Sequence, residues 1–401
     1  MSEPAPERVR VVGPLASFAD GFRVDLVERG YALWSAQFQL LLVAHLSRWM
    51  EAEGLEVAQL TPPMVERFLA ERRQQGYATR LSPVGVRPLL GYLDRLGVLP
   101  PSEEVCSPVD RLLEEFRRYL LEERALTVGS VGLYEPVARV FLAERPEPIG
   151  EDLARLSAAE VLAFVLRESR RRGRASALTM VCALRALLRF LHVRGWIAAP
   201  LATVVPSIPR RREDLPRGIP AGQVQGLLDG CDRATSVGRR DFAILVLLAR
   251  LGLRRGEVAA VALDDVDWRA GELVIRGKGS RIDRLPLPGD VGEALADYLR
   301  CGRPGGFGRT LFLRSCAPVV GLSSAGVSSV VVRACERAGI PPVAAHALRH
   351  TLASELLRRG AALPEIGQVL RHQSLETTAI YAKVDRAALS RLALPWPGGE
   401  S

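Results

Sequence analysis

The sequence predicts a mainly α-helical protein, with two helical domains followed by an α+β domain that carries a small β-hairpin sheet. The chain has 401 residues, of which 48% are apolar and 25% charged, so it can bury more than one core. Apolar residues recur at helical spacing in the first half, whereas short strand-like runs occur only at 273–287. We expect domains at 1–105, 106–207 and 221–401, with a linker at 208–220.

The charge of the chain points to a polyanionic partner. The formal net charge is +9, which favours nucleic acid but specifies no fold. Residues 1–107 carry a net −2, residues 108–213 a net +5 and residues 214–401 a net +6. We therefore expect double-stranded DNA to contact mainly the last two thirds of the chain.

The sequence shows no signal for export or membrane insertion. Residues 1–6 have neither a basic segment nor an apolar one, and no uninterrupted run of about 18 apolar residues occurs. The six scattered cysteines form no C-x-x-C motif, so we expect reduced packing residues without disulfides or zinc. These features predict a cytoplasmic protein without a membrane span or a zinc site. With DNA as the expected partner, we expect the protein to be nucleoid-associated and to need no metal or cofactor.

The first two domains look like copies of one unit of about four helices. Residues 60–68 match residues 156–164, and residues 89–97 match residues 187–195 at nearly the same offset. Thr61 and Ser157 lie where helix N-caps are expected. Convergent helix patterning is the alternative explanation. The negative charge of the first copy favours an extension or a protein contact over independent DNA binding.

Two basic stretches are candidates for phosphate contacts. The first ends a helix of the second domain, and a solvated helix end is its alternative explanation. The second lies in the Pro-rich segment 206–220, which predicts an extended linker that can lie along a duplex. The candidate residues are Arg170, Arg171, Arg172, Arg174, Arg210, Arg211 and Arg212.

The third domain has a different sequence pattern from the first two. Residues 242–251 are apolar nearly all round, which predicts a buried helix ended by Gly252. Residues 273–276 and 284–287 predict two short strands around a Gly-Lys-Gly turn. Helices are expected from the loop at 302–308 to about residue 392.

Lysine is rare in this chain. Of the 54 basic residues 52 are Arg, and the two lysines are Lys278 and Lys383. Arg does not give up its proton in proteins, whereas Lys does, so a retained lysine is a candidate proton donor. Glycines on both sides of Lys278 permit close approach to a ligand. Chance and an exposed turn lysine are the alternatives, and for Lys383 a solvated residue is favoured over a phosphate contact.

Histidine and arginine side chains gather on one predicted helix face. His346, Arg349 and His350 lie at positions i, i+3 and i+4, so they project together. Zinc is not expected, because the H-E-x-x-H motif requires Glu where Ala347 stands and Arg349 would repel a cation. A His-Arg face suits an anion such as phosphate.

Together these motifs resemble the tyrosine recombinase (phage integrase) family. The resemblance covers about residues 214–390, and the second helical domain is similar to the family's core-binding domain. It implies SAM-like helical domains before an α+β tyrosine-recombinase catalytic domain. The matching residues, in the family's order, are Gly252-Leu-Arg254-x-x-Glu257, Gly277-Lys278-Gly279, His346-x-x-Arg349-His350, Leu370-x-His372 and Tyr381.

The resemblance also has departures and finer features. The segment 377–385 is similar to mobile-element integrases more than to chromosome-dimer resolvases. Arg371 stands where many members carry Gly, which leaves the chemistry intact but affects the local backbone. The additional N-terminal domain is absent from compact two-domain members.

The resemblance assigns a role to each matching residue. Tyr381 attacks a DNA phosphodiester and forms a 3′-phosphotyrosine, and Lys278 protonates the departing 5′-oxygen. Glu257 and His350 support the site, and no metal or cofactor takes part. The groups that hold the phosphate are Arg254, His346, Arg349 and His372, of which His346 is also able to accept the tyrosine proton.

The residue types suit this chemistry. Guanidinium groups are planar and permanently charged, so they stabilise the negative charge that builds on a pentavalent phosphorus. The leaving alkoxide needs a proton, which Lys can supply. The resemblance implies that each protomer holds duplex DNA between residues 108–205 and residues 214–390. It also implies that four protomers assemble as a homotetramer on two DNA sites. The alternatives are a type IB topoisomerase and a catalytically inactive DNA-binding regulator.

Overall fold

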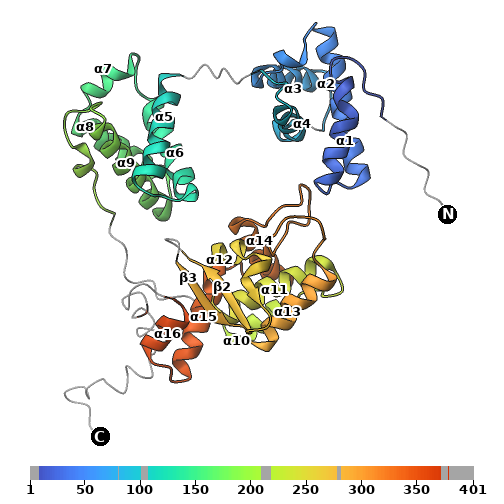
Figure 1. Ribbon diagram of the computed structural model, residues 1–401. Coiled ribbons are helices and arrows are strands. Elements are labelled where there is room, and N and C mark those ends of the chain that lie inside the picture. Colours follow the sequence, from blue (N-terminus) through green and yellow to red (C-terminus); the bar gives the residue numbers. More distant parts are fainter. Residues whose placement is uncertain are drawn as a thin grey trace, which may run out of the picture. The chain divides into compact units, whose positions relative to one another are not determined.

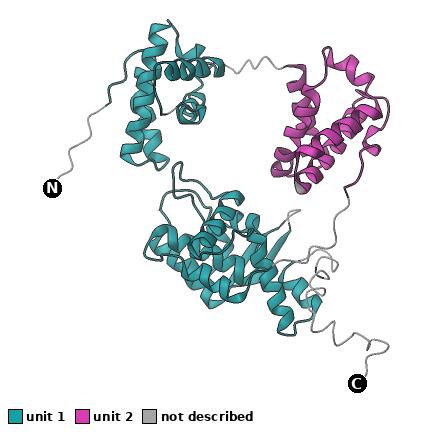
Figure 2. Cartoon of the chain, turned by 180° about the vertical axis from the view of Figure 1, so that it is seen from behind, with its two compact units in different colours: residues 1–99, 212–401 teal, residues 100–211 magenta. Residues whose placement is uncertain are grey.

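The computed structural model describes residues 9–79, 81–100, 107–208, 218–277, 281–371 and residue 378. Helices dominate this part of the chain (Figure 1). Contacts divide the chain into two compact units, residues 100–211 and residues 1–99 with 212–401 (Figure 2). The large hydrophobic cores lie within residues 15–93, 112–205 and 227–348, so each predicted domain has its own core. The exact domain boundaries stay predictions.

The N-terminal helices pack around one core. Phe22 of α1 and Leu46 of α2 are fully buried, and the indole of Trp49 donates a hydrogen bond to Glu71 of α3 at 2.7 Å. Burial of such side chains, rather than helix propensity, provides most of the stability of short helices. The elements are η1 (Ala16–Phe18), α1 (Ala19–Glu28), α2 (Leu33–Ala52), η2 (Val57–Gln59), α3 (Pro62–Gln74) and α4 (Pro83–Arg95).

Residues 100–211 form a second helical unit with an aromatic core. Phe141 of α6 and Phe164 of α8 meet edge to face with ring centroids 5.0 Å apart, a favourable arrangement. Helix α6 packs along α9. The elements are α5 (Pro108–Arg118), the π-helical turn η3 (Tyr119–Glu123), α6 (Val128–Ala143), α7 (Ile149–Ala154), α8 (Ala158–Arg171), α9 (Arg174–Val193) and η4 (Leu201–Thr203).

Corresponding residues of the two predicted copies occupy similar local positions. Phe68 and Phe164 are both buried, and Gly97 and Gly195 both end a helix at positive φ. Ser157 caps α8 through its side chain, whereas Thr61 precedes α3 without a side-chain cap. The duplication stays a prediction, and these local matches are the observations in its favour.

One stretch of α9, Ser176–Val193, is long and apolar enough to cross a membrane by length and composition, with a mean hydropathy of 1.5. Half of this window is buried inside the protein, and core helices of soluble proteins pass the same test. Arg185 and Arg189 interrupt the run, and Arg185 donates a hydrogen bond to the Val205 carbonyl at 2.8 Å. The window is therefore weak support for a membrane span.

The C-terminal domain is built around the buried helix α11. Helices α12, α13, α14 and α15 pack directly against α11. Ile244 and Leu247 are fully buried, as the apolar sequence predicts. The helices are α10 (Ala221–Asp229), α11 (Ser236–Arg250), α12 (Arg255–Ala260), η5 (Leu263–Asp265), α13 (Gly289–Cys301), α14 (Ser324–Arg337), α15 (Ala345–Arg358) and α16 (Leu363–Val369).

A small antiparallel sheet completes this domain. Its strands are β1 (Val266–Asp267), β2 (Glu272–Arg276) and β3 (Ile282–Pro286), in the order β1-β2-β3. The predicted hairpin is confirmed, with Val274 opposite Arg284. Strand β1 was not predicted, because two residues are too short to show a strand periodicity.

The cysteine prediction is partly wrong. The five described cysteines are free, as expected, but only Cys231 and Cys335 are buried. Cys182, Cys301 and Cys316 are exposed, so they are not packing residues. Cys182 lies on α9, Cys301 ends α13 and Cys316 lies between α13 and α14, and the sequence alone does not show which of these positions packing covers.

Replacing Phe141 by Ala should destabilise residues 100–211. Phe141 is fully buried, and a Phe→Ala cavity in a core typically lowers the free energy of unfolding by about 3–5 kcal/mol. Urea denaturation of the full chain measures this. The control is Val140→Ala on the same helix, where the side chain is 38% exposed and the loss should stay below about 1 kcal/mol. Equal losses for both variants would contradict the assigned core.

Candidate active site

Gly252 connects the buried helix α11 to the site. Its φ is +57°, and a Cβ at this position would lie 2.8 Å from Leu370 Cδ2. Its carbonyl accepts a hydrogen bond from Arg349 Nη1 at 2.5 Å. Glycine therefore serves two purposes here, because it adopts the left-handed turn and lets the chain approach α15 and α16 closely.

Arg254 is the residue that precedes α12. Its backbone N–H donates to Glu257 Oε2 at 2.8 Å, and its Nη1 donates to Glu257 Oε1 at 2.6 Å. The Arg254 side chain remains 43% exposed, whereas that of Glu257 is 5% exposed. The buried carboxylate thus fixes both the main chain and the head of Arg254 while leaving the guanidinium accessible to a ligand.

Glu257 has a second cationic partner, Arg371. Arg371 Nη2 donates to Glu257 Oε2 at 2.8 Å, and both side chains are almost fully buried. Burial raises the pKa of the Glu257 carboxyl, but the hydrogen bond from the Arg254 amide and the charge of Arg371 outweigh it, so the pKa lies below its ordinary value. Glu257 is therefore ionised at neutral pH.

Arg349 connects three segments of the domain. It lies on α15, is 1% exposed, and donates to the carbonyls of Gly252 and Leu370. These hydrogen bonds hold the segment after α11 and the turn after α16 against α15. A buried guanidinium with fixed backbone partners loses little conformational freedom when it also binds an anion.

His346 and His350 form a pair at the start of α15. Their ring centroids are 4.4 Å apart in a T-shaped arrangement. His346 is exposed to solvent, but desolvation by the surrounding protein and the charges of Arg349 and Arg254 still lower its pKa. Burial, His346 and Arg349 lower the pKa of His350 to about 4. Both imidazoles are therefore neutral at neutral pH, so His346 has a nitrogen that can accept a proton.

The structure brings together the described members of the predicted catalytic set. Arg254 is paired with Glu257, and Arg349 donates to the carbonyl of Gly252, two residues before Arg254. His346 and Arg349 lie one turn apart on α15. The remaining predictions, Lys278, His372, Tyr381 and Lys383, lie outside the described residues, as do Arg210, Arg211 and Arg212. Their roles stay predictions.

The basic helix end of the second unit is mixed in character. Arg170, Arg171 and Arg174 are exposed, so they are accessible to a ligand. Arg172 is half-buried and donates to the buried Glu168 at 2.8 Å, so it contributes to its own domain. We therefore expect phosphate contacts from the three exposed arginines rather than from Arg172.

Sequence reasoning missed Arg371 as a member of the site. It was noted only as a departure at a position without a catalytic role. The left-handed φ of +53° explains why glycine suits this position, because a non-glycine residue pays about 1 kcal/mol there. The partnership with Glu257 spans 114 residues of sequence, and no local pattern indicates it.

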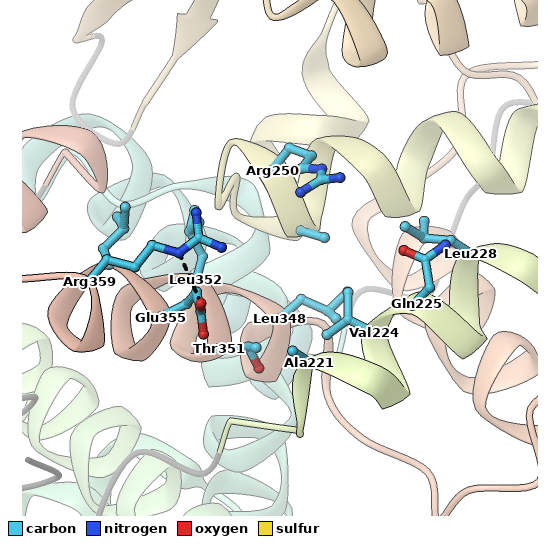
Figure 3. Close-up of a pocket in the computed structure, with 12 residues that line it drawn as sticks. Ala221, Val224, Gln225, Leu228, Arg250, Leu348, Thr351, Leu352, Glu355 and Arg359 are labelled. Carbon is cyan, nitrogen blue, oxygen red and sulfur yellow. Dashed lines mark hydrogen bonds and ion pairs between the residues drawn. The ribbon is translucent and has the colours of Figure 1, made fainter.

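A separate pocket of about 260 Å³ lies between α10, α11 and α15 (Figure 3). Val224 and Leu348 give it an apolar floor, and Arg359 donates to Glu355 at 3.0 Å at one side. Its lining residues do not include Arg254 or His346, so it is distinct from the arginine–histidine site. Among the described residues, no cluster of His, Cys, Asp or Glu could hold a metal ion.

The fold matches that of tyrosine recombinase catalytic domains. A crystal structure of the XerH recombinase, bound to a palindromic difH substrate, aligns with a TM-score of 0.54 at 18% identity, covering 73% of this chain and 98% of that one. A lambda integrase dimer bound to a COC′ core site aligns with a TM-score of 0.53 at 17% identity, covering 72% and 98%. These similarities concern the fold.

Sequence comparison gives the family. Residues 218–387 match the phage integrase family model. The integrase/recombinase y4rA of Sinorhizobium fredii is 41% identical over 393 residues, covering 96% of this chain and 95% of the relative. The tyrosine recombinase XerD of Mycobacterium tuberculosis is 32% identical over 324 residues, covering 77% and 96%. The chain belongs to the phage integrase family and is an enzyme of the tyrosine recombinase type.

His350→Gln should weaken the pH dependence of stability. The unfolded chain binds a proton near pH 6.5, but folded His350 resists it until about pH 4, so wild-type stability falls as pH drops through this window. This residue accounts for up to about 3 kcal/mol of that fall. Urea denaturation at pH 7 and pH 4.5 measures the difference. If the free energy of unfolding changed equally with pH in both proteins, the half-buried His350 would not be the neutral imidazole described here.

Proposed function

We propose that this protein is a site-specific DNA recombinase that cuts and rejoins double-stranded DNA through a 3′-phosphotyrosine intermediate. The observation that carries the proposal is the arrangement of Arg254, held by Glu257, with Arg349 and His346 in one domain of a phage integrase family member. This set of groups binds and activates a phosphodiester without a metal ion.

The cleavage step transfers the phosphoryl group from a DNA oxygen to the protein. The phenolic oxygen of Tyr381 forms a bond to phosphorus as the bond to the 5′-oxygen breaks. The tyrosine proton moves to neutral His346, and Lys278 supplies a proton to the 5′-oxygen. Reversal by a 5′-hydroxyl of another strand restores the diester, and the energy of the original bond is conserved.

The arginines and His372 stabilise the transition state. Arg254 and Arg349 neutralise charge on the non-bridging oxygens, and His372 hydrogen-bonds the phosphate. Guanidinium groups that are already fixed need no reorganisation during the reaction, so their hydrogen bonds contribute fully at the transition state. The fixed partners of Arg254 and Arg349 support this assignment.

Strand exchange requires several protomers on paired DNA sites. We place duplex DNA between the second helical domain and the catalytic domain, contacted by the exposed arginines at 170–174 and by the linker arginines. A homotetramer would exchange strands through a Holliday junction. One fold relative is a lambda integrase tetramer bound to a Holliday junction, with a TM-score of 0.52 at 16% identity. We also expect the tail 384–401, which lies outside the described residues, to contact a neighbouring protomer.

The biological role that we propose is integration, excision or transposition of a mobile element. The relative y4rA, similar over nearly the whole chain, is described as an integrase or recombinase. The enzyme would act in the cytoplasm on DNA of the nucleoid. The N-terminal domain would extend the clamp or contact another protein.

Tyr381→Phe should abolish the covalent protein–DNA adduct, because it removes the nucleophilic oxygen. The measurement uses labelled duplexes cut from the DNA that flanks the gene, each nicked so that cleavage traps the adduct, followed by denaturing electrophoresis. The control is Tyr77→Phe, in which the replaced side chain is 40% exposed in the N-terminal domain.

The wild type and Tyr77→Phe should both give an adduct. An adduct that persists in Tyr381→Phe would overturn the nucleophile assignment. Relaxation of supercoiled DNA by monomers without pairing of sites would instead favour a type IB topoisomerase.

Lys278→Ala should lose strand cleavage on normal DNA by about 100-fold or more, because general acid catalysis typically contributes a factor of this size. A duplex with sulfur at the bridging 5′ position has a better leaving group and should recover much of the rate. Lys383→Ala, the change of the one other lysine, is the control and should show no such selective rescue. An equal loss of cleavage rate on both duplexes would show that Lys278 does not protonate the departing 5′-oxygen.

A further inference from the structure

The carboxylate of Glu257 lies between two guanidinium groups. Its Oε1 accepts from Arg254 Nη1, and its Oε2 accepts from the Arg254 backbone N–H and from Arg371 Nη2. The Arg254 side chain is 43% exposed, whereas the side chains of Glu257 and Arg371 are at most 5% exposed. The exposed side chain of Arg254 is thus held by the buried Glu257, which is itself paired with the buried Arg371.

The charges of this cluster show what Arg371 adds to the Arg254–Glu257 pair. A single carboxylate paired with Arg254 would cancel its charge and weaken its attraction for an anion. With Arg371 included, two cations share one anion and the cluster keeps a net charge of +1. Because Glu257 is buried, removal of Arg371 would strengthen the hold of the carboxylate on Arg254.

Arg371 occupies a backbone conformation that glycine adopts more easily. Its φ is +53°, in the left-handed region. Its Nε is buried and has no hydrogen-bond partner among the described residues. An arginine side chain in such a position carries both a backbone strain and an unsatisfied donor, which a purely space-filling role would not require.

The turn that contains Arg371 is also bound by the other site arginine. Arg349 donates to the Leu370 carbonyl, and Arg371 donates to Glu257. The turn after α16 is therefore attached to α15 by one arginine and to α12 by the other. Residues 370–371 therefore contact both Arg349 and Glu257, the partner of Arg254.

We propose that Arg371 is a positioning residue that acts through Glu257 to orient Arg254 and to preserve its positive charge for the scissile phosphate. This inference rests on the function proposed above. In this proposal Arg371 acts through Glu257 and Arg254 and makes no contact of its own with the scissile phosphate. Its effect should appear in the rate of the chemical step rather than in DNA affinity, because Arg254 acts most strongly on the charge that develops in the transition state.

The test compares Arg371→Gly, Arg371→Lys, Glu257→Gln and the double variant Arg371→Gly/Glu257→Gln. Glycine suits the backbone at this position, so Arg371→Gly removes the charge without adding strain. The probe is a nicked duplex that the wild type cleaves, and the readouts are the single-turnover cleavage rate and the dissociation constant of the DNA. The matched control is Arg309→Gly, which breaks an exposed pair with Asp264 in the same domain.

We expect Arg371→Gly to slow cleavage by about 10- to 100-fold, a typical effect of losing an outer partner of a reactive group, with DNA affinity changed less than about 3-fold. Arg371→Lys should recover part of the rate because it restores the cation. In the Glu257→Gln background, Arg371→Gly should add less than about 3-fold, because the residue through which it acts is already neutral. Arg309→Gly should keep the wild-type rate.

Several outcomes would overturn the proposal. Wild-type cleavage by Arg371→Gly would show that the ion pair does not affect Arg254. Effects that multiply in the double variant would show that Arg371 acts independently of Glu257. Loss of the folded state in Arg371→Gly and Arg371→Lys, detected by circular dichroism, would assign Arg371 a structural role. Absence of any adduct with the wild type would reject the proposed function itself, which is a distinguishable result.

Discussion

The carboxylate of Glu257 is the interaction on which the site depends. It is a buried charge, and such a charge is stable only when donors surround it. The donors come from the amide and guanidinium of Arg254 and from Arg371, so one side chain fixes the start of α12 and the turn after α16. The accessible guanidinium of Arg254 is a consequence of this buried arrangement.

The electrostatic environment extends from this carboxylate to the histidines. Desolvation by the surrounding protein, and then the charges of Arg349 and Arg254, lower the pKa of His346. A cationic site that keeps its imidazoles neutral can attract a phosphodiester and still accept a proton. The same charges thus perform two functions, because the field that stabilises an anion also disfavours protonation of a nearby base.

Much of the fold follows from local patterns. The buried helix α11, the stop at Gly252 and the β2–β3 hairpin were predicted because periodicity, glycine positions and β-branched runs act over a few residues. The short strand β1 was not predicted, because two residues are too few to show a strand periodicity. The exposure of three cysteines was not predicted either, because it depends on how the elements pack. The pairing of His346 and His350 followed directly from helical spacing.

By itself, the sequence determined the residue types of the site, their order along the chain and the family to which they belong. The charge and the motif residues are properties of the chain that need no fold to be recognised. The tertiary structure alone decided that Arg371 pairs with Glu257 and that Arg349 is buried against the Gly252 and Leu370 carbonyls. Those contacts join residues that are 114, 97 and 21 positions apart in the sequence. Only the packing of α12, α15 and α16 brings their atoms within hydrogen-bonding distance.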